Sequence, residues 1–110
     1  MSGKLLLKME NGLFELPVED VIYMEKNLRK IKLHANRRVI EFYGTFNDLK
    51  YLLDDRFMHC HRSFIINMDK IEKMERGMIY LRNREPIWLG RDTFSRAQKA
   101  FVAYSRKKYK

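Results

Sequence analysis

The chain has 110 residues, 45% of them hydrophobic, so its length fits one domain and its composition excludes a mainly disordered state. It carries 23 Lys and Arg against 14 Asp and Glu, a formal net charge of +9. No apolar run approaches the ~20 residues of a membrane-spanning helix, and the single cysteine, Cys60, fits a reducing compartment. We therefore expect one cytoplasmic domain over residues 1–110.

The positive charge is concentrated in two places. Six Lys or Arg and no acidic residue lie from Lys26 to Val39, and four more basic residues lie among the last five. Two basic regions on an otherwise balanced chain predict a polyanionic partner, with nucleic acid as the leading candidate. A solvated surface without a partner and an anionic membrane surface are the alternatives.

The first part of the chain has the pattern of short strands joined by tight turns. Asn11-Gly12 is a hairpin signal, and Pro17 ends the strand that follows it. Between residues 29 and 35 polar and apolar residues alternate, which is typical of a half-buried strand with a basic outer face. We expect strands at residues 4–10, 13–16, 21–26, 29–35 and 38–43.

The period then changes to that of a helix. Thr45 has the position of an N-cap, with Asp48 three residues later. The apolar stripe of this helix comprises Phe46, Leu49, Leu52 and Leu53. We expect further strands at residues 57–60, 63–67, 71–75, 78–81 and 87–89, and a C-terminal helix at 93–104.

These elements predict a mainly β fold: an elongated antiparallel multi-sheet β-sandwich of about ten short strands, with one internal helix and a C-terminal helix.

Signals for catalysis or metal binding are weak. The scattered glycines form no phosphate-binding loop, and the paired carboxylates Glu19-Asp20 and Asp54-Asp55 fit a turn and a helix end. Cys60 lies between two histidines, but a closed zinc site needs four ligands and the chain has only one other histidine, His34. We interpret Cys60 as structural and expect no enzyme activity, catalytic residue, metal or cofactor.

Arg62 conflicts with a continuous strand over residues 57–67. In such a strand it would share one face with Cys60 and Phe64, and an unpaired buried guanidinium is very costly. We predict a bend at His61-Arg62 that turns Arg62 outward, with a buried ion pair as the alternative. An exposed arginine at a strand end is a good probe for guanine.

The string His61-Arg62-Ser63-Phe64-Ile65-Ile66-Asn67, followed by Ile71, resembles the signature of the LytTR family. These are DNA-binding domains of bacterial response regulators. Residues 22–25 resemble the family's early strand. Residues 40–44, with Leu49 and residues 55–57 after them, resemble the branch that regulates quorum sensing, virulence and bacteriocin genes, and the resemblance runs from about Leu5 to Phe101. It implies an elongated all-β domain whose loops enter successive major grooves and bend the duplex.

The resemblance also implies three base-contacting residues, Arg29, Arg62 and Arg91. Leu28 and Lys30 are the alternatives for the first contact. We expect backbone contacts or support from Lys26, Lys30, Arg37, His61, Ser63, Asn67, Lys107 and Lys108.

The expected function is sequence-specific binding of double-stranded DNA at direct-repeat promoter sites, with a second copy on the adjacent half-site. The chain is either a stand-alone member or the partner of a receiver domain in a longer parent chain. One alternative is a β module for single-stranded nucleic acid or RNA, although we interpret most of its candidate stacking aromatics as core: Tyr23, Tyr43, Tyr51 and Trp88. Another is a membrane- or partner-binding basic C-terminal helix, whose apolar stripe we expect to pack on the sandwich instead.

Overall fold

The computed structural model describes residues 3–10, 12–82 and 84–108, so Asn11 of the expected hairpin turn and Lys110 of the basic tail lie outside the described residues. The strands are β1 (Lys4–Met9), β2 (Gly12–Pro17), β3 (Val21–Asn27), β4 (Lys30–Ala35), β5 (Val39–Tyr43), β6 (Phe57–His61), β7 (Phe64–Asn67), β8 (Ile71–Glu75), β9 (Met78–Leu81) and β10 (Ile87–Trp88). The helices are α1 (Phe46–Leu49) and α2 (Arg91–Lys108), with single 3-10 turns at Val18–Asp20, Lys50–Leu52 and Met68–Lys70. The predicted mainly β fold is confirmed.

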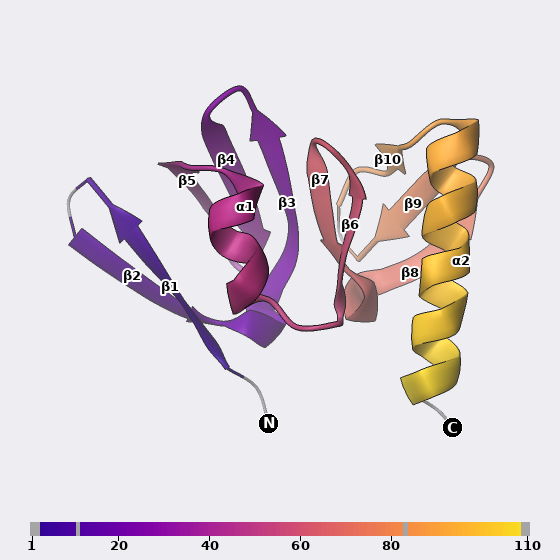
Figure 1. Cartoon of the computed structure of the whole chain (residues 1–110), viewed down its shortest axis with the longest axis horizontal. Coiled ribbons are helices and arrows are strands. Elements are labelled where there is room, and N and C mark those ends of the chain that lie inside the picture. The colour runs from indigo at the N-terminus through magenta and orange to yellow at the C-terminus, as the bar shows by residue number, and fades with distance from the viewer. Residues whose placement is uncertain (1–2, 11, 83, 109–110) are drawn as a thin grey trace.

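The strands form three antiparallel sheets. The β1–β2 hairpin lies on one side, a five-stranded sheet of order β5-β4-β3-β7-β6 lies in the middle, and a three-stranded sheet of order β10-β9-β8 lies beyond it (Figure 1). Helix α2 packs on β6, and the molecule measures 40 × 32 × 25 Å. Two cores result, one on each side of the central sheet.

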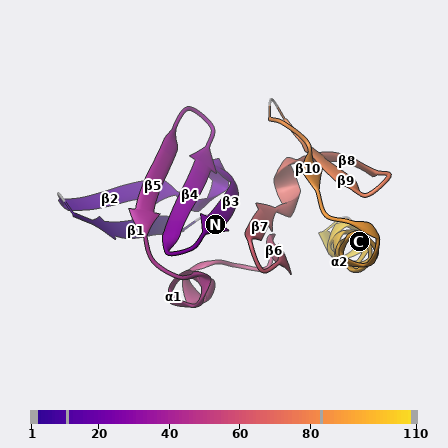
Figure 2. The ribbon, with the colours of Figure 1, turned by 90° about the horizontal axis from the view of Figure 1, so that it is seen from above.

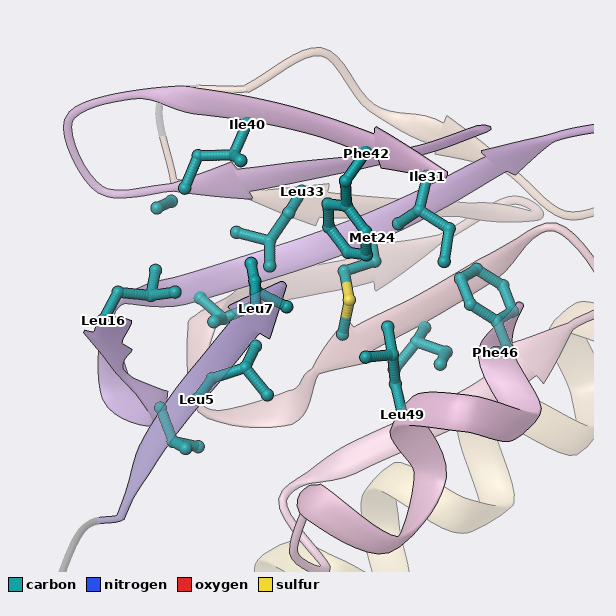
Figure 3. Close-up of a cluster of buried hydrophobic side chains, with 14 residues drawn as sticks. Leu5, Leu7, Leu16, Met24, Ile31, Leu33, Ile40, Phe42, Phe46 and Leu49 are labelled. Carbon is teal, nitrogen blue, oxygen red and sulfur yellow. The ribbon is translucent and has the colours of Figure 1, made fainter. Parts of the chain in front are cut away.

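The two central strands are buried on both faces, which explains their continuous apolar runs. Successive side chains of a strand point to opposite faces. In β3, Met24 packs into the core shared with the hairpin, whereas Tyr23 packs into the core shared with α2. Ile65 and Ile66 of β7 divide in the same way. Figure 3 shows the first core from within.

Helix α1 begins as the sequence predicts. The Thr45 hydroxyl accepts a hydrogen bond from the Asp48 backbone N–H at 3.3 Å, and the Asp48 carboxylate accepts one from the Thr45 N–H at 3.4 Å. After one turn the chain tightens into a 3-10 turn, which leaves Leu52 40% exposed. The prediction that Leu52 belongs to the buried apolar stripe is therefore wrong. A 3-10 turn has three residues per turn, which rotates the Leu52 side chain off the buried face.

Helix α2 extends further at both ends than its apolar stripe predicts. Phe94, Phe101 and Tyr104 pack against the second core, so the apolar face required by a membrane-binding helix is already covered. The Tyr104 hydroxyl and the Lys108 ammonium both donate to Asp69 Oδ1 at 2.7 Å. Burial opposes ionisation of this carboxyl, but the two hydrogen bonds outweigh burial and hold the pKa of Asp69 below its usual value.

The interpretation of most aromatic candidates as core is wrong. Tyr23 is buried, but Tyr43 is 75% exposed, Tyr51 81% and Trp88 64%. Tyr43 and Trp88 occupy the outward positions of edge strands next to the inward-facing Phe42 and Ile87, and Tyr51 lies in the 3-10 turn after α1. Local pattern alone did not separate the covered face of these strands from the open one.

Candidate nucleic-acid interface

Three exposed basic residues lie along one edge of the molecule. Arg29 is in the turn between β3 and β4, Arg62 is in the turn between β6 and β7, and Arg91 is the first residue of α2. Figure 1 shows both turns and the start of α2 along the upper edge of the molecule. We call this surface, defined by Arg29, Arg62 and Arg91, the turn edge. The structure thus places along one edge the three residues that the LytTR resemblance implies as base contacts.

A backbone hydrogen bond ties the first turn to the second. The N–H of Lys26, near the end of β3, donates to the Ser63 carbonyl at 2.9 Å. The Arg29 carbonyl accepts from the Gly44 N–H, also at 2.9 Å, which fixes the other side of the β3–β4 turn. The spacing between Arg29 and Arg62 is therefore set by backbone contacts rather than by flexible loops.

Arg29 suits base contact better than the two alternatives for the first loop. Leu28 is exposed and left-handed, with φ 60, but it carries no polar side-chain group. Lys30 forms an ion pair with Glu41 at 3.7 Å, and its ammonium lies 5.7 Å from the centre of the Tyr43 ring. Within the part of the chain that the structure describes, Arg29 has no such partner.

The β6–β7 turn presents Arg62 outward, as predicted. The Ser63 N–H donates to His61 Nδ1 at 3.0 Å, which closes the turn around Arg62. Arg62 is exposed and has no hydrogen bond or ion pair with any described residue. The alternative of a buried ion pair is therefore wrong, and His61 and Ser63 support the turn from within.

A shared hollow connects the second turn to the start of α2. It is lined by His59, Cys60, His61, Arg62, Thr93 and Arg96, from β6, the turn and the first part of the helix. Seen from above in Figure 2, β6 and β7 lie next to α2.

Cys60 packs against the second core, and burial raises the pKa of its thiol to about 11. The thiol is protonated at neutral pH, which supports the structural interpretation of Cys60.

Three of the expected backbone contacts lie away from the turn edge. Arg37 is in the β4–β5 turn, at the opposite end of β4 from Arg29 and about 20 Å away at 3.3 Å per residue. Lys107 and Lys108 follow Arg91 by 16 and 17 residues of helix, or about 25 Å. They form ion pairs with Asp55 at 3.5 Å and Asp69 at 2.7 Å. This placement does not support contacts by these residues with the same stretch of DNA.

The expectation that Asn67 contacts or supports the DNA backbone is narrowed to a supporting role, because Asn67 is buried. Its side chain is 0% exposed. Nδ2 donates to the Val21 carbonyl at 2.8 Å, and Oδ1 accepts from the Asp69 N–H at 2.9 Å. Asn67 therefore supports the fold, because both of its polar groups are used inside the protein.

Sequence reasoning missed two exposed arginines close to the predicted contacts. Arg96 lines the hollow beside Arg62, and Arg76 lies in the β8–β9 turn. The signal for the second was the Arg-Gly pair at residues 76–77, which separates two expected strands. Over residues 3–10, 12–82 and 84–108, no group of three His, Cys, Asp or Glu side chains could hold a metal ion. Across the same ranges, no helix has both the length and the apolar character needed to cross a membrane.

A mainly β domain with exposed arginines along one edge has the features of a DNA-binding module. The sequence matches the LytTr DNA-binding domain family over residues 11–102, and the chain belongs to this family.

Two kinds of relative agree with this assignment. The chain is 34% identical over 83 residues to accessory gene regulator protein A of Staphylococcus aureus (strain N315) and equally to that of Staphylococcus epidermidis. These matches cover 72% of this chain but 34% of each relative, so the chain spans about a third of their length. A solved Bacillus cereus LytTr DNA-binding domain of a response regulator superposes with a TM-score of 0.72 at 25% identity, covering 88% of this chain and 94% of that one.

Proposed function

We propose that the chain is a single domain that binds double-stranded DNA at specific sequences in the cytoplasm and thereby regulates transcription. The observation that carries this proposal is the row of three exposed arginines on the turn edge, none with an ion-pair partner among the described residues. The planar guanidinium can donate two hydrogen bonds to O6 and N7 of guanine, a pattern found in the major groove. Turns that project from a rigid sheet present such groups without a recognition helix.

The arrangement of the exposed aromatic residues favours double-stranded over single-stranded nucleic acid. Single-strand binding uses aromatic rings on which successive bases stack. Here Tyr43 lies on β5, Tyr51 lies in the 3-10 turn after α1 and Trp88 lies on β10, so the three rings belong to separate elements, and the two strands belong to different sheets. They do not form one continuous stacking platform.

Two copies acting on direct repeats would supply the specificity that one domain lacks. Each good base contact contributes only about 1–3 kcal/mol of discrimination. Three such contacts are few against the ~10⁶–10⁹ competing sites in a genome. We propose that two copies bind one face of the duplex, with repeats spaced by a whole number of helical turns. A receiver domain in a longer parent chain would regulate this binding.

The decisive experiment compares three polyanions at the same moderate salt concentration. Sites are first selected from a random duplex pool, and the chain is then titrated with the selected duplex, its separated strands and anionic lipid vesicles. We expect tight binding to the duplex alone. Binding to single strands or vesicles that equals binding to the duplex would refute the proposal.

Insertion of half a helical turn between the repeats tests the tandem arrangement separately. It should abolish cooperative binding, because the second site is moved to the opposite face of the duplex. If cooperativity persists unchanged, the tandem part of the proposal is wrong while DNA binding itself stands.

A further inference from the structure

The turn between β8 and β9 contains an exposed arginine that the three predicted contacts leave unused. Arg76 and Gly77 form this turn, and both have left-handed backbones, with φ of 53 and 82. Arg76 is exposed, and it has no ion pair or hydrogen bond within the described part of the chain. The neighbouring Glu75 already pairs with Lys73, whose ammonium lies 3.6 Å from the carboxylate.

This turn is fixed beside the start of α2. The Gly77 carbonyl accepts a hydrogen bond from the Leu89 N–H at 2.9 Å. Trp88 lies against the same glycine, because a Cβ built on Gly77 would be only 2.7 Å from Trp88 Cζ3. Arg76 directly precedes Gly77, and Arg91 follows Leu89 by two residues. Both arginines therefore lie next to this hydrogen bond in the chain. Figure 1 shows the β8–β9 turn beside the end of α2 at which the helix begins.

The surface formed by Arg76, Trp88 and Arg91 suits contact with a DNA backbone. Arg76 and Arg91 are two exposed cations held by one rigid backbone contact. Trp88 adds a large ring that is 64% exposed although it packs on Gly77. An exposed guanidinium and an exposed indole ring on adjoining segments suit a phosphate and its sugar, and such contacts orient a protein on the duplex without reading the sequence.

We propose that the β8–β9 turn is a fourth DNA-contact element, in which Arg76 binds a backbone phosphate next to the base read by Arg91. In the same complex the duplex covers Trp88. This inference rests on the proposed DNA-binding function and extends it to a part of the chain beyond the signature string. It makes Arg76 a contact that adds affinity and fixes orientation, while Arg62 and Arg91 provide specificity.

Substitution of Arg76 tests the phosphate contact. Arg76→Asn removes the charge and keeps a residue that tolerates the left-handed backbone. Arg106→Ala is the matched control, because it removes one exposed charge near the far end of α2. For Arg76→Asn, log K against log salt should lose about 0.9 of its slope, the value for one phosphate. Affinity for the selected and a random duplex should fall by equal factors, whereas the control keeps the parent slope.

The fluorescence of Trp88 gives a second readout, because it is the only tryptophan in the chain. Saturating duplex should protect it from quenching by acrylamide. A parent protein that binds no duplex would overturn the proposed function and this inference with it. If the parent binds duplex, an unchanged slope for Arg76→Asn or unchanged quenching of Trp88 overturns the fourth contact alone.

Discussion

Arg62→Ala separates a base-reading residue from a structural one. The side chain is exposed and makes no hydrogen bond or ion pair with the described residues, so its removal leaves no buried group unsatisfied. Surface substitutions of this kind change the free energy of unfolding by no more than about 0.5 kcal/mol. For a domain of this size that corresponds to a change in melting temperature below about 4 °C. The variant should therefore fold as the parent does.

The effect on DNA binding should be much larger than the effect on folding. Loss of a bidentate contact to guanine costs about 1–3 kcal/mol. Since 1.4 kcal/mol is tenfold, Kd for the selected duplex should rise by about five- to 150-fold. Kd for a random duplex should change little. Arg62→Lys should restore only part of the loss, because an ammonium lacks the planar fork.

The neighbouring histidine provides a matched pair of variants for the same turn. His61→Ala removes the acceptor of the Ser63 N–H, whereas His61→Asn offers an oxygen in nearly the same place. The first should weaken specific binding and the second should retain most of it. Fluorescence anisotropy with selected and random duplexes, together with thermal melting, measures all four variants. If Arg62→Ala melts far below the parent, or loses specific and random binding equally, Arg62 is not a base reader.

Four further predictions follow from the geometry. If only the turn edge and the cations next to it contact DNA, a plot of log K against log salt should have a slope of about −3 to −4. Lys107→Ala should leave this slope unchanged in binding titrations at several salt concentrations. Asn67→Ala should lower the free energy of unfolding by about 2–3 kcal/mol in urea titrations, because the buried Val21 carbonyl loses its donor. Cys60 should react with iodoacetamide at pH 8 about a hundredfold more slowly in the folded than in the unfolded chain, because burial raises the pKa of the thiol to about 11. The lowered pKa of Asp69 contributes stability that is present above about pH 4 and is lost as the pH falls through the lowered value, so melting curves of Asp69→Asn should depend less on pH in that range than those of the parent.

The sequence by itself determined the local elements and the outward bend at Arg62. Alternation at Ile31, Leu33 and Ala35 predicted a strand with one buried face, and all three are buried. Thr45 and Asp48 predicted the start of α1, since a capping box depends only on residues three apart. The bend at Arg62 followed from the energy of burying a charge, which depends on the chemistry of the residue and its immediate neighbours.

Tertiary structure alone decided which residues share a surface. Arg29 and Arg37 lie in one basic run of the sequence. In the structure they lie at opposite ends of β4, which separates them along the paired strands β4 and β5. Burial likewise could not be predicted from the sequence at Trp88 and Asn67. The apolar Trp88 is exposed, whereas the polar Asn67 is buried. A strand's period of two tells which side chains share a face, but a second layer of structure decides which face is covered. The turn edge exists because backbone hydrogen bonds join segments far apart in the chain, and no local pattern of residues records those contacts.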